Sequence, residues 1–191
     1  MNLKQTNEYV NKLLTTEWVM WIHDGSIPAN SNSEKILNTI SGALFNHCAR
    51  CLNLNGCCFV KNKCPEIPVH PNCHCYTVEI DEINPTTTSA IEKFTKYIFD
   101  EVKNNGKKQL FELWGYSVLD SEFFKNELEK QAKLAYMSGN YELGKLDIFG
   151  QRITIKISLK DKLKDRIIEF NSGWMMYPDG KIVLTTPYGD K

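Results

Sequence analysis

Several features that would point directly to a function are missing from the sequence. No apolar run is long enough to cross a membrane, and no histidine follows His74. Lys and Arg total 23 and Asp and Glu also total 23, so the net charge is zero and gives no general attraction to nucleic acid or membrane. Residues 1–4 lead into polar sequence without the apolar core of a secretory signal, so we expect a cytoplasmic protein with no membrane partner.

The composition is that of a folded protein. Hydrophobic residues make up 42% and aromatic residues 11% of the 191 positions, which is enough for a packed core. A chain of this length forms one domain or two small ones.

Cysteine is confined to one stretch. All seven cysteines lie within residues 48–75, and three of the four histidines lie in or beside that stretch. A C-x-x-C pair is followed, after 21 residues, by a C-x-C pair inside the sequence HPNCHC. Two short-spaced thiol pairs can bind one tetrahedral Zn²⁺. We therefore predict a structural zinc site with Cys48, Cys51, Cys73 and Cys75 as ligands, His70 or His74 being able to replace one of them.

Other uses of the cysteines remain open. A disulfide framework is disfavoured by the odd number of cysteines and by the reducing compartment expected for the chain. Unliganded thiols are a further alternative. Cys57, Cys58 and Cys64 are left over by the four-ligand count, which leaves room for a second metal ion.

In the first half, hydrophobic spacing predicts a helix over about residues 3–22 and a second over about 34–45 that carries Cys48 and Cys51 at its end. Residues 76–80 are predicted to be a strand leaving the site. The polar, turn-rich stretch 84–89 is the best candidate boundary. We therefore predict two domains, a helical zinc-stapled lobe over residues 1–83 and an α+β domain over residues 84–191.

In the second half, helices are predicted over about 91–102, over 107–114, and from Asp120 or Ser121 to about 137. Beyond them the period changes to two, which predicts strands at about 153–158, 167–176 and 181–186, the last two joined by a turn at 177–180. Helices followed by hairpin-linked strands give an α+β fold class, with the helices packed on a small twisted antiparallel sheet.

Cys48-x-x-Cys51 together with the segment from His70 to Cys75 resembles the end of phage head-morphogenesis (minor head protein) domains. Those domains close with a similar H-P-N-C-R-C signature. His74 stands here in place of the usual arginine, and the long helical region of those proteins is largely missing. The resemblance covers about 30 residues and implies a phage or prophage context for the cysteine segment.

Residues 94–188 resemble a small domain at the ends of bacterial polymorphic toxins. The matching elements are F-x-x-Y at 94–97, G-K at 106–107, Phe111, G-Y at 115–116, S-G-W at 172–174, P-D-G at 178–180 and L-T-T-P-Y at 184–188. The resemblance implies membership of the barnase–EndoU–colicin–RelE group, in which helices pack against a twisted sheet and many members cut RNA without a metal.

Metal-free RNA cleavage requires groups that move protons and stabilise charge at the phosphate. Because no histidine follows His74, a histidine-based mechanism must borrow one from the first half or is absent, and the second half offers charged side chains, Asp147 among them, and hydroxyls. Arg152 and Lys156 are four residues apart on a predicted strand, so they share a face. The full set of predicted catalytic residues is Lys145, Arg152, Lys156, Ser172, Thr185 and Tyr188.

The sequence therefore predicts a prophage- or toxin-associated effector with a structural zinc site and a ribonuclease-like second domain that acts on RNA. The alternative is a non-enzymatic phage morphogenesis or interaction factor that binds a partner protein. In that case Arg152 and Lys156 are ordinary solvent-facing strand cations.

Overall fold

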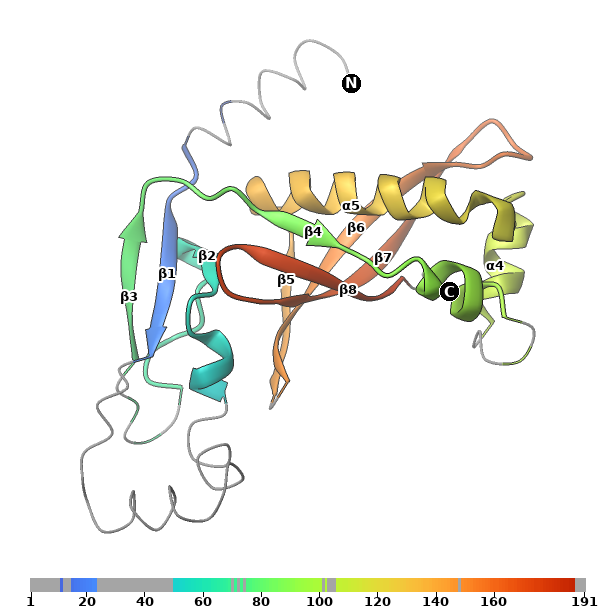
Figure 1. Cartoon of the computed structure of the whole chain (residues 1–191). Coiled ribbons are helices and arrows are strands. Elements are labelled where there is room, and N and C mark those ends of the chain that lie inside the picture. The colour runs from blue at the N-terminus through green and yellow to red at the C-terminus, as the bar shows by residue number, and fades with distance from the viewer. Residues whose placement is uncertain are drawn as a thin grey trace. The chain divides into compact units, whose positions relative to one another are not determined.

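The computed structural model describes residues 11, 15–23, 50–69, 71, 73, 75–100, 102, 106–147 and 149–187. Helices and strands both occur in this part of the chain, so the predicted α+β class is confirmed (Figure 1). Tyr188 and the predicted ligands Cys48 and His70 lie outside the described residues.

Internal contacts divide the chain into two compact units, which are described separately. Unit 1 consists of Met1–Asn84, Leu143–Arg152 and Met176–Lys181. Unit 2 consists of Pro85–Glu142, Ile153–Met175 and Ile182–Lys191. The sequence prediction placed everything after residue 83 in the second domain, whereas unit 1 also takes in two later segments.

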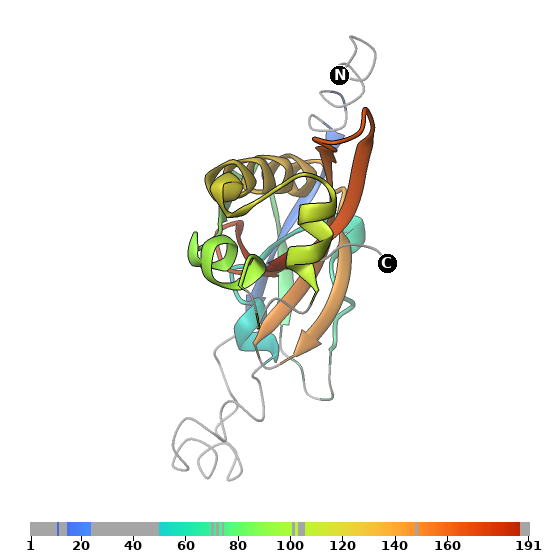
Figure 2. The same cartoon turned by 90° about the vertical axis from the view of Figure 1, so that its right-hand side faces the viewer.

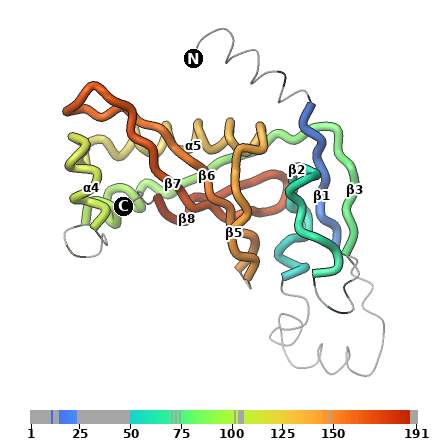
Figure 3. The backbone as a smooth tube through the Cα atoms, turned by 180° about the vertical axis from the view of Figure 1, so that it is seen from behind, coloured from blue at the N-terminus to red at the C-terminus, as the bar shows by residue number. Residues whose placement is uncertain are grey.

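Unit 1 contains a three-stranded antiparallel sheet in the order β2-β1-β3. Its strands are β1 (Trp18–His23), β2 (Cys58–Val60) and β3 (Cys75–Ile80). Figure 3 shows β1 between the other two strands. The register places Met20 opposite both Cys58 and Val78, and it pairs His23 with Cys75. A short 3-10 turn, η1 (Lys61–Lys63), follows β2.

The predicted helix over residues 3–22 is wrong from Trp18 onward, because Trp18–His23 form strand β1. Trp18, Val19 and Trp21 are all buried, so both faces of the strand are covered. An apolar run buried on both faces has no period of two, and sequence spacing alone cannot separate it from a buried helix. In the first half of the chain, the described residues therefore form a sheet-based lobe rather than the helical one predicted.

The second predicted helix, over residues 34–45, lies outside the described residues. Residues 50–54 are helical and carry Cys51, and the chain then turns at Gly56 into β2. The predicted strand at 76–80 is confirmed as β3.

The remaining strands form a five-stranded sheet in the order β4-β8-β7-β6-β5. Its members are β4 (Thr86–Thr88), β5 (Glu142–Asp147), β6 (Gly150–Lys160), β7 (Ile167–Met176) and β8 (Lys181–Pro187). Strands β5 to β8 follow one another through short turns, as in an antiparallel meander. The strands predicted near 153–158, 167–176 and 181–186 are confirmed as β6, β7 and β8.

The helical elements of unit 2 precede this meander. They are η2 (Lys93–Ile98), α4 (Lys107–Leu113), η3 (Val118–Asp120) and α5 (Ser121–Met137). Helix α5 buries Phe124, Leu128, Ala132 and Tyr136 at a spacing of four, and Figure 2 shows it along one side of the strands. The amide of Gln131 joins α5 to β6, donating to the Ser158 carbonyl at 2.7 Å and accepting from its N–H at 2.9 Å.

The core of unit 2 is rich in aromatic rings. The Phe111 ring lies 4.9 Å from Phe124, 5.5 Å from Phe170 and 5.3 Å from Trp114, all measured between centroids and all close to edge-on. Edge-to-face packing of this kind favours a single arrangement of the rings. Alternate residues of β6, namely Ile153, Ile155 and Ile157, are also buried.

Candidate metal centre

Three thiols of unit 1 lie close together. The sulfurs of Cys51, Cys73 and Cys75 are all within 4.8 Å of one another, and those of Cys51 and Cys73 are 3.7 Å apart. In a tetrahedral zinc site with Zn–S bonds of about 2.3 Å, neighbouring sulfurs are about 3.8 Å apart. The cluster therefore has dimensions that could hold a metal ion.

The distances do not fit a disulfide, in which the sulfurs are about 2.05 Å apart. None of the six cysteines in the described part of the chain forms one. Cys51 and Cys75 are buried and Cys73 is half-buried, so the cluster is largely shielded from water.

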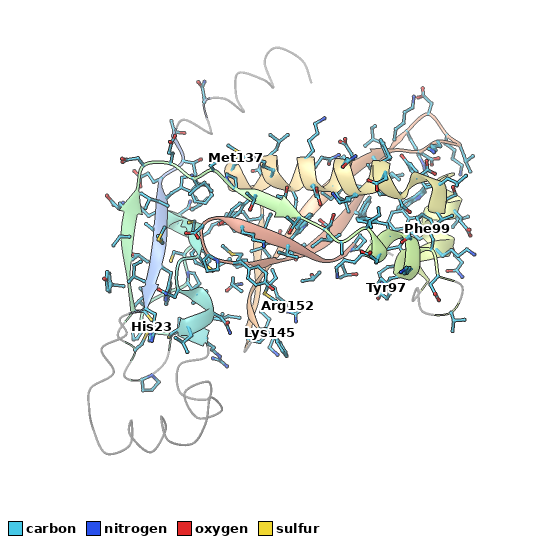
Figure 4. All side chains as sticks on the ribbon, viewed as in Figure 1. His23, Tyr97, Phe99, Met137, Lys145 and Arg152 are labelled. Atoms are coloured by element: carbon cyan, nitrogen blue, oxygen red, sulfur yellow. The ribbon has the colours of Figure 1, made fainter. Side chains whose placement is uncertain are left out.

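Two elements of unit 1 bring the thiols together. Cys51 lies in the helical residues 50–54, and Cys75 is the first residue of β3. Strand β1 ends beside them, because its register pairs His23 with Cys75 and places the His23 Nδ1 atom 3.5 Å from the Cys75 sulfur. Figure 4 labels His23 at this end of β1. The Asn55 side chain accepts a hydrogen bond from the His23 backbone N–H at 2.9 Å and ties β1 to the turn after Cys51.

Burial and neighbouring groups shift the pKa values of the three thiols. Burial, and then the neighbouring Cys75 and Cys73, raises the pKa of Cys51 well above its usual range, and burial also raises the pKa of Cys75. Burial acts on Cys73 in the same direction, but the backbone N–H groups of Cys75 and Val69, together with the thiols of Cys75 and Cys51, outweigh it and lower that pKa. A cation among the sulfurs would favour the thiolate form of all three.

Of the predicted metal ligands, the structure brings together Cys51, Cys73 and Cys75. Cys48, His70 and the alternative His74 lie outside the described residues. His23 was not among the predicted ligands. Its place beside Cys75 follows from a strand pairing across 52 residues, within a segment that hydrophobic spacing predicted to be helical.

The three leftover cysteines, Cys57, Cys58 and Cys64, do not belong to the cluster. The Cys57 thiol donates to the Asn53 carbonyl at 3.4 Å, and burial raises its pKa to about 12. Burial raises the pKa of both Cys58 and Cys64 to about 11. These pKa values are those of thiols that stay protonated at neutral pH.

The predicted catalytic cations are exposed, and two of them face acidic side chains. Figure 4 labels Lys145 on β5 and Arg152 on β6. Arg152 lies 3.4 Å from the Asp147 carboxylate, and Lys156 lies 3.4 Å from that of Glu169. Ion pairing reduces the positive charge that Arg152 and Lys156 would offer to a phosphate.

The predicted catalytic hydroxyls are less accessible. Ser172 is fully buried, donates to the Ile155 carbonyl at 2.9 Å and accepts from the Trp174 indole N–H at 2.8 Å. Both hydrogen-bonding roles of this hydroxyl are therefore used within the core. Thr185 is half-buried on β8, and Tyr188 lies outside the described residues.

Among the described residues, no helix is both long and apolar enough to span a membrane. No protein-family model, no curated protein and no solved structure matches the chain.

Proposed function

We propose that unit 1 is a zinc-binding module in which Cys51, Cys73 and Cys75 supply three thiolate ligands. The observation that supports it is the 3.7 Å separation of the Cys51 and Cys73 sulfurs, within a group of three that all lie inside 4.8 Å. The predicted ligand Cys48, three residues before Cys51, is the first candidate to complete the tetrahedron.

Thiolates select soft or borderline metal ions, and a tetrahedral set of sulfurs is typical of Zn²⁺. A catalytic zinc site keeps one position open to water or substrate, whereas a structural site is closed by protein ligands. Cys51 is 1% exposed and Cys75 is 7% exposed, which favours a closed and therefore structural site.

The proposed zinc would act as a cross-link. It would join the helical residues 50–54 to the start of β3 and close a loop between Cys51 and Cys73, which are 22 positions apart. Because the site forms only in the folded chain, the binding free energy of the metal adds to the stability of that state. A reducing, cytoplasmic environment would keep these thiols available for the metal.

The test measures metal content and thermal stability together. The purified chain is expected to contain about one zinc per molecule, and a chelator should remove it and lower the melting temperature. Cys51→Ser should lose the metal, whereas Cys64→Ser, a matched change outside the cluster, should keep it. Wild-type protein that binds no zinc after reduction and reconstitution, or a Cys51→Ser variant that binds as tightly as wild type, would refute the proposal.

For residues 84–191 we propose a non-enzymatic role in binding a partner protein, as a phage or prophage accessory factor. The contacts of the predicted catalytic side chains support this choice, since Arg152 and Lys156 face carboxylates and the Ser172 hydroxyl is buried. Ribonuclease activity remains a prediction drawn from the toxin-domain resemblance.

Incubation of the full chain with total tRNA separates the two roles for residues 84–191. We expect no cleavage by wild type and no difference between wild type and Arg152→Ala/Lys156→Ala. Cleavage by wild type that the double variant loses would restore the ribonuclease and overturn the non-enzymatic proposal.

A further inference from the structure

Among the buried side-chain nitrogen and oxygen atoms in the described part of the chain, one has no hydrogen-bond partner: the indole nitrogen of Trp21. Trp21 is fully buried, and its indole N–H can only donate. Leaving such a donor unsatisfied in the interior costs about 1–3 kcal/mol, so native proteins rarely do it without a reason.

The position of Trp21 in the sheet shows where this donor lies. Side chains alternate between the two faces of a strand, so Val19, Trp21 and His23 of β1 share one face. Cys75, which is paired directly with His23, is on that same face, and Trp21 is its diagonal neighbour across the strands. The indole is therefore on the face of the sheet that carries the Cys75 sulfur, and its N–H has no hydrogen-bond partner.

The backbone holds Trp21 firmly in this place. Its N–H donates to the Cys57 carbonyl at 2.9 Å, and its carbonyl accepts from the Gly56 N–H at 2.8 Å. These bonds fix the Trp21 backbone, and the full burial of the side chain leaves the indole no access to water as an alternative partner.

We propose that Trp21 and His23 are the outer shell of the metal centre, each donating an N–H to the sulfur of Cys75 when that residue binds the ion. The proposal rests on the metal site proposed above and assigns a role to β1, which supplies none of the three thiols. A metal-bound thiolate carries negative charge and only accepts hydrogen bonds, so it would give the orphaned Trp21 N–H a partner.

A metal-bound Cys75 thiolate would also determine which ring nitrogen of His23 carries the hydrogen. Because a bound thiolate cannot donate, the His23 Nδ1 atom, 3.5 Å from the Cys75 sulfur, must carry the hydrogen. His23 acts from outside the coordination sphere, since it is not among the residues whose ligand atoms all lie within 4.8 Å of one another. Both residues are thus positioning residues rather than ligands.

Trp21→Phe tests the proposal most cleanly, because it removes the N–H and keeps a buried aromatic ring. Zinc affinity is measured on the full chain by competition with a chromogenic chelator. Loss of an outer-shell partner typically weakens metal binding by about 10–100-fold, and we expect a loss in that range. Trp18→Phe is the matched control, since Trp18 is a buried tryptophan on the opposite face of β1 and should retain the wild-type affinity.

Cobalt substitution adds a readout that a packing defect would not move. A hydrogen bond lowers the energy of the sulfur lone pairs, so its loss in Trp21→Phe should shift the sulfur-to-cobalt charge-transfer band to longer wavelength. His23→Leu should produce the same shift, whereas His23→Gln, which retains an N–H donor, should restore much of the wild-type spectrum. The ligand-field bands should keep their tetrahedral pattern in every variant, because no ligand is removed.

The experiments distinguish failure of the metal site from failure of the outer shell. Wild-type protein that binds no metal refutes the site and this proposal together. Wild type that binds metal while Trp21→Phe matches Trp18→Phe in affinity and spectrum refutes the outer shell alone. If Trp21→Phe does not fold, the His23→Leu and His23→Gln pair decides, and equal spectra for these two variants would overturn the proposal.

Discussion

The buried pair formed by Ser172 and Trp174 allows a quantitative test of whether Ser172 is structural or catalytic. Both residues are 0% exposed, and the Trp174 indole donates to the Ser172 hydroxyl at 2.8 Å. Ser172→Ala would leave that N–H in the interior without a partner, and it would also remove the donor to the Ile155 carbonyl. An unsatisfied buried group costs about 1–3 kcal/mol, so the variant should be destabilised by that amount.

Denaturant unfolding followed by circular dichroism measures this loss without relying on tryptophan fluorescence. In a thermal scan, each 1 kcal/mol corresponds to about 2–4 °C in the melting temperature of a chain of this size. Trp174→Phe supplies the second arm of a double-mutant cycle. Replacing both partners by apolar groups removes the unsatisfied N–H, so the double variant should be less destabilised than the sum of the single variants.

Two results would refute this reasoning. If the free energy of unfolding of Ser172→Ala is within about 0.5 kcal/mol of wild type, the hydrogen bonds of the Ser172 hydroxyl do not contribute to stability. Changes of that size are typical of surface positions. Strict additivity in the cycle would mean that Ser172 and Trp174 do not act as a pair.

Other predictions concern particular contacts within each unit. Glu129→Ala should destabilise unit 2 by about 1–3 kcal/mol, because one carboxylate oxygen accepts from both the N–H and the hydroxyl of buried Ser89 at 2.6 Å. Gly56→Ala should cost unit 1 at least about 1 kcal/mol, because φ is +78° and a β-carbon would lie 2.9 Å from a neighbouring side chain. The Arg166 side chain holds the pKa of Asp161 below its usual range, so Asp161→Asn should lower the melting temperature at neutral pH, and the difference from wild type should shrink in acid.

The sign of the pH effect is fixed by the direction of the shift. A carboxyl whose pKa is lowered by folding stabilises the protein above its unfolded value of about 4, and this contribution is lost as pH falls through the folded pKa. A difference between Asp161→Asn and wild type that grows in acid would contradict it. Glu122→Ala, at an exposed position of α5, is the control for Glu129 and should be near neutral. Equal stabilities for Glu129→Ala and Glu122→Ala, or an unaffected Gly56→Ala, would count against those contacts.

The part of the fold that sequence predicted well is the part with a clean period. Strand β7 begins and ends at the predicted residues, and the alternation of Ile153, Ile155 and Ile157 marks the buried face of β6. Helix α5 was predictable because its buried residues recur every four positions and Ser121 is its first residue. In these elements one face is buried and the other is not, so the pattern shows in the sequence.

Four strands, β1, β2, β4 and β5, were not predicted, and β1 and β5 show two different reasons. Trp18–His23 is apolar on both faces and looked like the end of an amphipathic helix. Glu142–Asp147 contains a glycine and three charged residues, and most of its positions are exposed, so no apolar alternation marks it as a strand. Tertiary pairing rather than local preference decided both cases.

The metal site also has a part that local sequence predicts and a part that depends on tertiary pairing. Spacing alone placed Cys51, Cys73 and Cys75 among the predicted ligands, together with Cys48, because short-spaced thiol pairs are a local signal. The positions of Trp21 and His23 depend on the register of β1 against β3, which is a pairing between residues more than 50 positions apart. Sequence distance does not specify such a register, so these neighbours of the site became visible only in the structure.

The most direct test of the metal centre is the X-ray absorption spectrum at the zinc edge of the zinc-loaded chain. The proposed site predicts that at least three sulfur atoms surround the ion at about 2.3 Å, and that Cys51→Ser removes this shell. A shell made only of oxygen and nitrogen atoms, or a sulfur shell that survives Cys51→Ser, would contradict it.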